Sequence, residues 1–277
     1  GHVCGIQLPE GLKESEKLKD KLYGANDTFS TLMNFYQRAN ATKIFKEYNA
    51  TTFTNKALAG IGGMEKKKAQ RFFNDLANEI NACGIGGALT VNVAAGTYNE
   101  AVTFEAISGT SASNTITING GGATIAYDGS GTQSATIRLR GTDHMTIDNL
   151  TIVNTESASY GWGIHLVQAA DSNTINNCTI NINQTSTSSS FAGIIATNSN
   201  TSTGSYANNA NYTMVSNTTV NGGYYGVRFN GLSATYNMNN SVMNSTFNEV
   251  SFYGVYNIYQ EAPMASGNTV NFRSSAT

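Results

Sequence analysis

The sequence Ile147-Asp148-Asn149-Leu150-Thr151-Ile152 carries the pattern that decides the fold, because this pattern recurs three times further along the chain. Each copy has an apolar residue, any residue, an asparagine, two more residues and a second apolar residue. The later copies are Ile175-Asn176-Asn177-Cys178-Thr179-Ile180, Val215-Ser216-Asn217-Thr218-Thr219-Val220 and Val242-Met243-Asn244-Ser245-Thr246-Phe247. Self-similarity of this kind is the signature of a repeat architecture.

A second unit, glycine followed by an aliphatic residue, is interleaved with the first. Its copies are Gly163-Ile164, Gly193-Ile194, Gly226-Val227 and Gly254-Val255. Two interleaved units with similar periods indicate a coil of roughly 22 to 33 residues that contributes two or three short strands to separate parallel sheets. An antiparallel sandwich would instead need hairpin turns about every 8–12 residues. We therefore predict a mainly β chain whose residues 84–277 form a right-handed parallel β-helix of about seven coils.

The asparagines of the first unit have a specific predicted role at the turn between two short strands. The turn requires the left-handed region, which asparagine tolerates better than other non-glycine residues. Because successive coils stack about 4.8 Å apart, the amide of each asparagine would donate to the carbonyl of the next one. We expect a buried internal ladder formed by Asn149, Asn177, Asn217 and Asn244.

Alternation around the second unit predicts which side chains point into the solenoid and which point outward. The predicted inward residues include Trp162, Tyr225, Phe229 and Tyr253. The residue after each glycine-aliphatic pair would point outward, and these residues are His165, Ile195, Arg228 and Tyr256. We expect them to stack on one face, where the neighbouring glycines leave the backbone accessible.

The N-terminal part of the chain differs from the rest in its charge. Only four of the 16 basic residues, all of them arginines, lie beyond residue 80. We expect residues 1–63 to form a small helical segment of unknown role, and residues 64–83 to form an amphipathic helix that caps the first coil. The apolar positions of this helix are Met64, Phe72, Phe73, Leu76 and Ile80, and Gly84 follows as a stop signal.

The three cysteines and the C-terminal end complete the domain prediction. Cys4 and Cys83 flank the N-terminal segment and are the pair best placed for a disulfide, although three cysteines leave at least one outside any internal pair. Cys178 lies in a repeated strand and would be a small buried apolar residue. Since residues 270–277 offer no cap, we expect the β-helix to be truncated there, so that it continues or another module stacks on its end.

The stretch from Asn81 to Glu100, with Ala106–Thr110 and Asn114–Ile118, resembles the β-helix modules of large surface proteins that gliding bacteria export through the type IX secretion system. The resemblance covers about residues 70–277. It implies a pectate-lyase-like solenoid within a modular protein that is secreted or held at a bacterial cell surface. It implies no particular ligand.

Catalysis on such a scaffold is the alternative function. Polysaccharide lyases of this shape use a Lys or Arg base, commonly beside calcium-binding carboxylates, and glycoside hydrolases use converging carboxylates. The predicted solenoid has no lysine. The residues that would have to converge are Asp143, Asp148, Asp171, His165 and Arg228. Asp143 and Asp171 each precede a repeat by four residues, which favours local hydrogen bonding in a turn over catalysis.

We therefore predict a non-catalytic, adhesin-type surface module that binds extracellular carbohydrate or other cell-surface material, with ligand contacts from His165, Arg228 and Tyr256. No residue pattern points to a cofactor or a metal. The formal net charge of -2 makes no case for nucleic acid, and no apolar run approaches the ~18 residues of a membrane span. A third possibility is a structural spacer or assembly subunit that stacks on another module through its C-terminal end.

Overall fold

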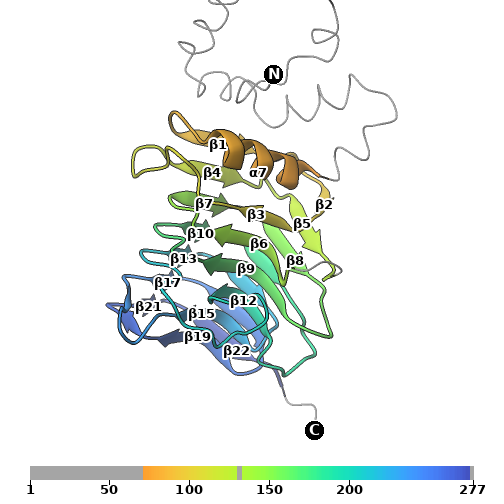
Figure 1. Cartoon of the computed structure of the whole chain (residues 1–277). Helices are drawn as coiled ribbons and strands as arrows, with labels where there is room; N and C mark the ends of the chain where they lie inside the picture. Colours follow the sequence, from red (N-terminus) through yellow and green to blue (C-terminus); the bar gives the residue numbers. More distant parts are fainter. Residues whose placement is uncertain (1–70, 130–132, 275–277) are drawn as a thin grey trace, which may run out of the picture.

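The computed structural model describes residues 71–129 and 133–274, and these residues form a parallel β-helix preceded by one helix (Figure 1). Each of the first six described coils adds one strand to each of three parallel sheets, and the last one adds a strand to the first two sheets. The predicted fold class is thereby confirmed. The predicted helical segment 1–63 lies outside the described residues, as do residues 64–70 of the predicted cap helix.

The three sheets run side by side along the solenoid, and strands of one sheet pair in parallel with strands of the next coil. The first sheet contains β1 (Leu89–Asn92), β4 (Ile116–Asn119), β7 (Met145–Asp148), β10 (Thr174–Asn176), β13 (Met214–Ser216), β17 (Ser241–Met243) and β21 (Met264–Ser266). The second contains β2 (Thr97–Asn99), β5 (Thr124–Tyr127), β8 (Thr151–Asn154), β11 (Thr179–Asn181), β14 (Thr219–Asn221), β18 (Thr246–Val250) and β22 (Thr269–Phe272). The third contains β3 (Val102–Phe104), β6 (Ala135–Arg140), β9 (Gly161–Val167), β12 (Phe191–Ala196), β15 (Tyr225–Asn230) and β19 (Tyr253–Ile258).

Two features depart from a uniform repeat. A further small sheet pairs β16 (Asn237–Met238) with β20 (Gln260–Glu261), next to the third sheet. The coil that begins with β10 and leads to β13 is longer than predicted. This is shown by the pairing of Thr174 with Met214, which are equivalent positions on successive coils. The extra length of this coil is residues 197–213, which follow β12 and which we call the cover loop.

The asparagines of the first unit stand at the turns between the first and second sheets, as predicted. Asn149, Asn177, Asn217 and Asn244 have φ values of 51°, 51°, 49° and 48°. The backbone N–H of each donates to a carbonyl of the following coil, for example Asn177 N to Ser216 O at 3.2 Å. The four residues therefore occupy equivalent corners of successive coils.

The predicted buried ladder between these four side chains is wrong, because the four side chains are exposed. Asn177 donates to Asp148 Oδ1 at 3.1 Å and Asn217 donates to Asn176 Oδ1 at 3.0 Å, so neither bonds to its counterpart. The left-handed backbone at the corner turns these side chains toward solvent.

An asparagine ladder does exist, at the end of the second sheet. Asn221 donates to Asn181 at 2.7 Å, Asn248 donates to Asn221 at 3.0 Å, and Asn271 donates to Asn248 at 2.8 Å. These residues are in register across β11, β14, β18 and β22. Identical amides on neighbouring coils can each accept one bond and donate another, which stabilises the stack.

Buried asparagines also stabilise the corner between the third and first sheets. Asn173 has no exposed surface, donates to Thr142 O at 2.7 Å and accepts from Met145 N at 2.9 Å. Asn240 does the same two coils later, between Ala210 O and Thr213 N. Each side chain pairs backbone groups that would otherwise be buried without partners.

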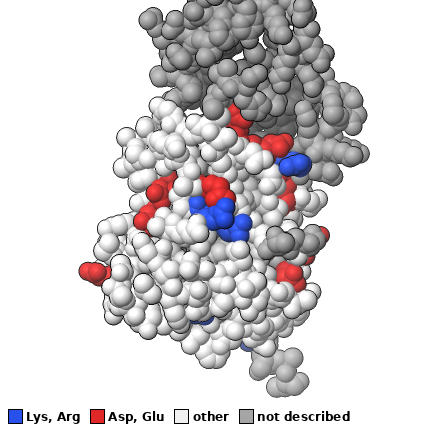
Figure 2. All heavy atoms as spheres, viewed as in Figure 1, with Lys and Arg blue, Asp and Glu red and all other residues white. Residues whose placement is uncertain are grey.

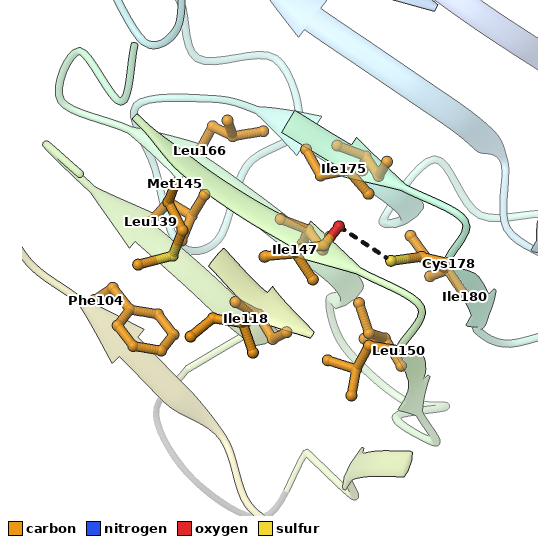
Figure 3. Packing of buried hydrophobic residues seen from close by; sticks show 14 of the residues in the cluster. Phe104, Ile118, Leu139, Met145, Ile147, Leu150, Leu166, Ile175, Cys178 and Ile180 are labelled. Atoms are coloured by element: carbon orange, nitrogen blue, oxygen red, sulfur yellow. Dashed lines mark hydrogen bonds between the residues drawn. The ribbon is translucent and has the colours of Figure 1, made fainter. Parts of the chain in front are cut away.

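The main core fills the space between the three sheets with aliphatic side chains from successive coils (Figure 3). Ile137, Ile164, Ile194 and Val227 form one inward column of the third sheet. Cys178 lies within this core as a free thiol whose Sγ donates to Ile147 O at 3.5 Å. Burial raises the pKa of this thiol to about 11. The prediction that Cys178 behaves as a small buried apolar residue is confirmed.

The prediction that Trp162, Tyr225 and Tyr253 point into this core is wrong. Trp162 and Tyr225 belong to a second apolar cluster that also contains Ile195, and Tyr253 packs against it. The glycine that follows each aromatic residue takes the inward position, since a Cβ at Gly163 would meet the core side chain of Ile180 and one at Gly226 that of Phe247. Two consecutive residues, the glycine and the aliphatic residue, thus face inward, and the regular alternation fails at this point.

Helix α7 (Phe72–Cys83) covers the first coil, as predicted (Figure 1). Phe73, Ala77 and Ile80 are buried in the same core as the first strands. The start of the helix is capped from the solenoid, because the Glu100 carboxylate accepts from the backbone of Phe73 at 3.0 Å and Asn74 at 2.9 Å. Burial nevertheless raises the pKa of Glu100.

Cys83, at the end of α7, is disulfide-bonded. Its predicted partner, Cys4, lies outside the described residues, so the pairing stays a prediction. At the opposite end of the solenoid, the residues of β21 and β22 are all exposed.

Candidate binding face on the third sheet

The predicted outward column of the third sheet exists, and it extends to earlier coils than predicted, since Thr103 of β3 pairs with Arg138 of β6. Arg138, His165, Ile195, Arg228 and Tyr256 pair in register across β6, β9, β12, β15 and β19. Sequence reasoning missed Arg138 because the glycine-aliphatic unit is absent from β6. The alternating pattern of Ala135–Arg140 was the available signal.

The expected accessibility of this column is wrong for three of its members. His165 is 1% exposed, Ile195 is 0% exposed and Arg228 is 6% exposed. The cover loop lies over them: its Thr203 O accepts from Asn230 of β15 at 2.8 Å, and its Asn200 Oδ1 accepts from Arg138 at 2.9 Å. Of the four predicted positions only Tyr256, beyond the loop, stays partly exposed, and Arg138 of β6 is partly exposed as well.

His165, on the third sheet, forms a hydrogen bond to the first residue of the cover loop. Its Nε2 lies 2.8 Å from Thr197 O, and because a carbonyl can only accept, this nitrogen carries the proton. The ring of Trp162 lies against it at 4.9 Å between centroids. Burial lowers the pKa of His165 to about 4, and the positive charge of Arg138 acts in the same direction. His165 is therefore neutral at pH 7.

We expect the stability of the protein to depend on the protonation of His165. The pKa of His165 is lower in the folded state than in the unfolded state. The stability that neutral His165 gives the folded protein is therefore complete above about pH 6.5 and is lost as the pH falls through 4. Urea unfolding between pH 7 and pH 4, followed by fluorescence of the single tryptophan, should show this decline.

The matched variant is His165→Gln, whose side-chain amide can still donate to Thr197 O but does not titrate. The decline from pH 6.5 to 4 should be smaller in this variant than in the wild type. Burial raises the pKa values of Glu100 and Asp143, which favours the folded state as the pH falls and so opposes the effect of His165. Both proteins contain these two residues, so the comparison cancels their effect. If the unfolding free energy fell equally with pH in the two proteins, the role assigned to His165 would be wrong.

Arg228 lies between the part of this face that the cover loop buries and a group of partly exposed aromatic side chains. Its guanidinium lies over the rings of Tyr225 and Tyr256, at 4.6 Å and 5.0 Å from their centroids. It also donates to Asn230 Oδ1 at 2.8 Å and to the Tyr225 hydroxyl at 2.5 Å. Within the described residues no carboxylate lies within ion-pair distance of it. The Arg228 guanidinium is therefore stabilised by two tyrosine rings and by hydrogen bonds to uncharged oxygen atoms.

The aromatic cluster beside Arg228 consists of Tyr224, Tyr225, Phe252, Tyr253 and Tyr256. Tyr225 and Tyr253 stack at 5.7 Å between centroids with 4° between their planes, and Tyr224 and Phe252 stack at 5.1 Å with 6°. Phe252 is 54% exposed and three of the tyrosines are half-buried. Sequence reasoning assigned two of these tyrosines to the core because strict alternation would place them there.

The three aspartates of the catalytic alternative serve the backbone and neighbouring side chains instead. Asp143 accepts from Asp171 N at 2.8 Å, and Asp171 accepts from Asn211 N at 2.7 Å, at the corner before the first sheet. Asp148 ends β7, at the other end of that sheet, and accepts from Asn176 at 2.7 Å. His165 and Arg228 lie on the third sheet, so the five residues do not converge.

Figure 2 shows a group of arginine and acidic atoms near the middle of the viewed solenoid face and further charged groups toward its edges, with uncharged residues over most of the rest. In the described part of the chain no three His, Cys, Asp or Glu side chains gather as metal ligands would. The single described helix is not long and apolar enough to cross a membrane.

The described fold and face define a parallel β-helix with an aromatic outer surface on its third sheet. Comparison with known proteins adds no name: no family model, no curated protein and no solved structure matches the chain.

Proposed function

We propose that this protein is a non-catalytic surface module of the adhesin type, which binds extracellular carbohydrate through the outer face of its third sheet. The observation that carries the proposal is the aromatic cluster, whose rings are in register on adjacent coils and are partly exposed. A sugar ring packs its apolar face on an aromatic ring, while tyrosine hydroxyls and nearby amides bond to its hydroxyl groups.

The rigidity of the face supports binding. The Arg228 guanidinium lies over two rings of the cluster, and its hydrogen bonds to Asn230 and Tyr225 hold it there. A surface that is already ordered loses little conformational entropy when a ligand binds. Tyr256 keeps its predicted role as a ligand contact, whereas His165 and Arg228 would act by positioning the cover loop and the rings.

The bonded state of Cys83 supports an extracellular location. Disulfides persist in oxidising compartments and are rare in the cytosol of most organisms. A bacterial cell surface is the location that the sequence resemblance implies.

The test is an array of plant, bacterial and animal polysaccharides probed with the whole 277-residue chain. Phe252→Ala should weaken binding to any responding glycan about tenfold, which corresponds to about 1.4 kcal/mol. Tyr212→Ala is the control, since Tyr212 is 50% exposed but belongs to no ring contact of the cluster.

Two results would oppose the proposal. If no glycan binds, or if both variants bind like the wild type, the aromatic face is not a carbohydrate site. Cleavage of a polysaccharide by the wild type would instead favour the enzymatic alternative, with residues other than the five predicted ones.

A further inference from the structure

A second group of exposed aromatic side chains lies at the other end of β19. Tyr206, Tyr236 and Tyr259 are 40%, 47% and 37% exposed. The ring of Tyr259 contacts both of the others, at 5.6 Å from Tyr206 and 6.1 Å from Tyr236 between centroids. We call these three residues the tyrosine triad.

The triad is assembled from three separate segments of the chain. Tyr206 lies in the cover loop, Tyr236 precedes β16, and Tyr259 follows β19. Backbone bonds fix the two segments around Tyr259, because its carbonyl accepts from Asn237 N at 3.1 Å and Ile258 O accepts from Gly231 N at 2.9 Å. These backbone bonds place Tyr236 and Tyr259 together, and the cover loop brings Tyr206 to them.

The triad and the aromatic cluster border the same face. Tyr253 begins β19 and belongs to the cluster, and Tyr259 follows the last residue of that strand. An extended strand rises about 3.3 Å per residue, so the two tyrosines are separated by about 20 Å. The cover loop, which carries Tyr206, lies on the outer face between them and the earlier coils.

The chemistry around the triad favours a neutral ligand with many hydroxyl groups. Exposed residues close in sequence to the triad include Asn208, Ser233, Thr235 and Asn239, which offer amide and hydroxyl groups, beside the apolar Leu232 and Met238. Glu261 is an acidic residue in β20, and the cation–ring contacts of the described residues join Arg228 to Tyr225 and Tyr256 and to no ring of the triad. An acidic glycan would meet no such described cation at these three rings, whereas the tyrosine rings and hydroxyls suit a neutral sugar.

We propose that the triad is a second contact for the same ligand, and that the ligand is a linear, neutral polysaccharide lying along β19. This inference rests on the proposed carbohydrate-binding function and narrows the ligand to one class of polysaccharide. Two contacts about 20 Å apart cannot be joined by one or two sugar units. Affinity must therefore rise with chain length, because the second contact becomes intramolecular once the first is made.

The test measures the affinity of the whole chain for β-1,4-linked glucose oligomers of two to six units, with galacturonic acid oligomers as the acidic counterpart. The wild type should bind the longest neutral oligomer at least about tenfold more tightly than the shortest. Tyr259→Ala should abolish this gain without changing affinity for the shortest oligomer. Tyr259→Phe keeps the ring and should retain the gain, and thermal unfolding checks that both variants fold.

Several outcomes would overturn the inference. Neutral oligomers that bind equally at all lengths, or a gain with length that survives in Tyr259→Ala, would leave the proposed function intact but remove the second contact. Preference for the galacturonic acid oligomers would overturn the neutral class. Failure of the proposed function itself is distinct, since then no glycan of any kind binds.

Discussion

Replacement of Gly193 by alanine should destabilise the protein by about 3 kcal/mol. A Cβ on Gly193 would lie 2.6 Å from the carbonyl oxygen of Gly226 in the next coil and against the side chain of Val220 in the core. Both neighbours belong to packed strands that cannot move without disturbing further coils. Chemical denaturation followed by circular dichroism would measure the loss.

Gly86→Ala is the matched control, because a Cβ there would meet no atom within 4 Å and the residue has no positive φ. This variant should unfold within about 0.5 kcal/mol of the wild type. The same argument applies to Gly163 and Gly226, whose added Cβ atoms would lie 2.6 Å and 2.5 Å from the carbonyl oxygen of the glycine in the next coil. A Gly193→Ala protein of unchanged stability would show that the coils are packed less tightly than described.

Replacement of Asn173 by alanine should cost about 4 kcal/mol, the second large effect that we expect. The change would leave Thr142 O and Met145 N without the partners that now lie at 2.7 Å and 2.9 Å, around a side chain with no exposed surface. Each buried backbone group left unpaired costs about 1–3 kcal/mol. The free energy of unfolding in urea is the quantity to measure.

Asn257→Ala provides the comparison, since Asn257 is an exposed asparagine within β19. It should change stability by no more than about 0.5 kcal/mol. Asn240→Ala should behave like Asn173→Ala, because Asn240 pairs the equivalent backbone groups two coils later. If both buried variants were as stable as Asn257→Ala, these corners would be hydrated and the assigned role would be wrong.

The candidate face was predicted in its register but not in its exposure. The position after each glycine-aliphatic pair placed His165, Arg228 and Tyr256 in one column, which the pairing of β9, β12, β15 and β19 confirms. Nothing in the local pattern showed that the cover loop would return over this column. Its hydrogen bonds join residues far apart in the chain, such as Arg138 and Asn200.

The sequence by itself determined the coil, because apolar residues, glycines and left-handed asparagines recur at the positions that stacked parallel strands require. It also determined the cap helix, whose apolar spacing matches the core that it covers. Only the tertiary structure decided which asparagines form a ladder, which aromatic rings face solvent, and which charged residues the cover loop buries. Those outcomes depend on contacts between coils, and local periodicity describes the spacing of residues along the chain but not what packs against them.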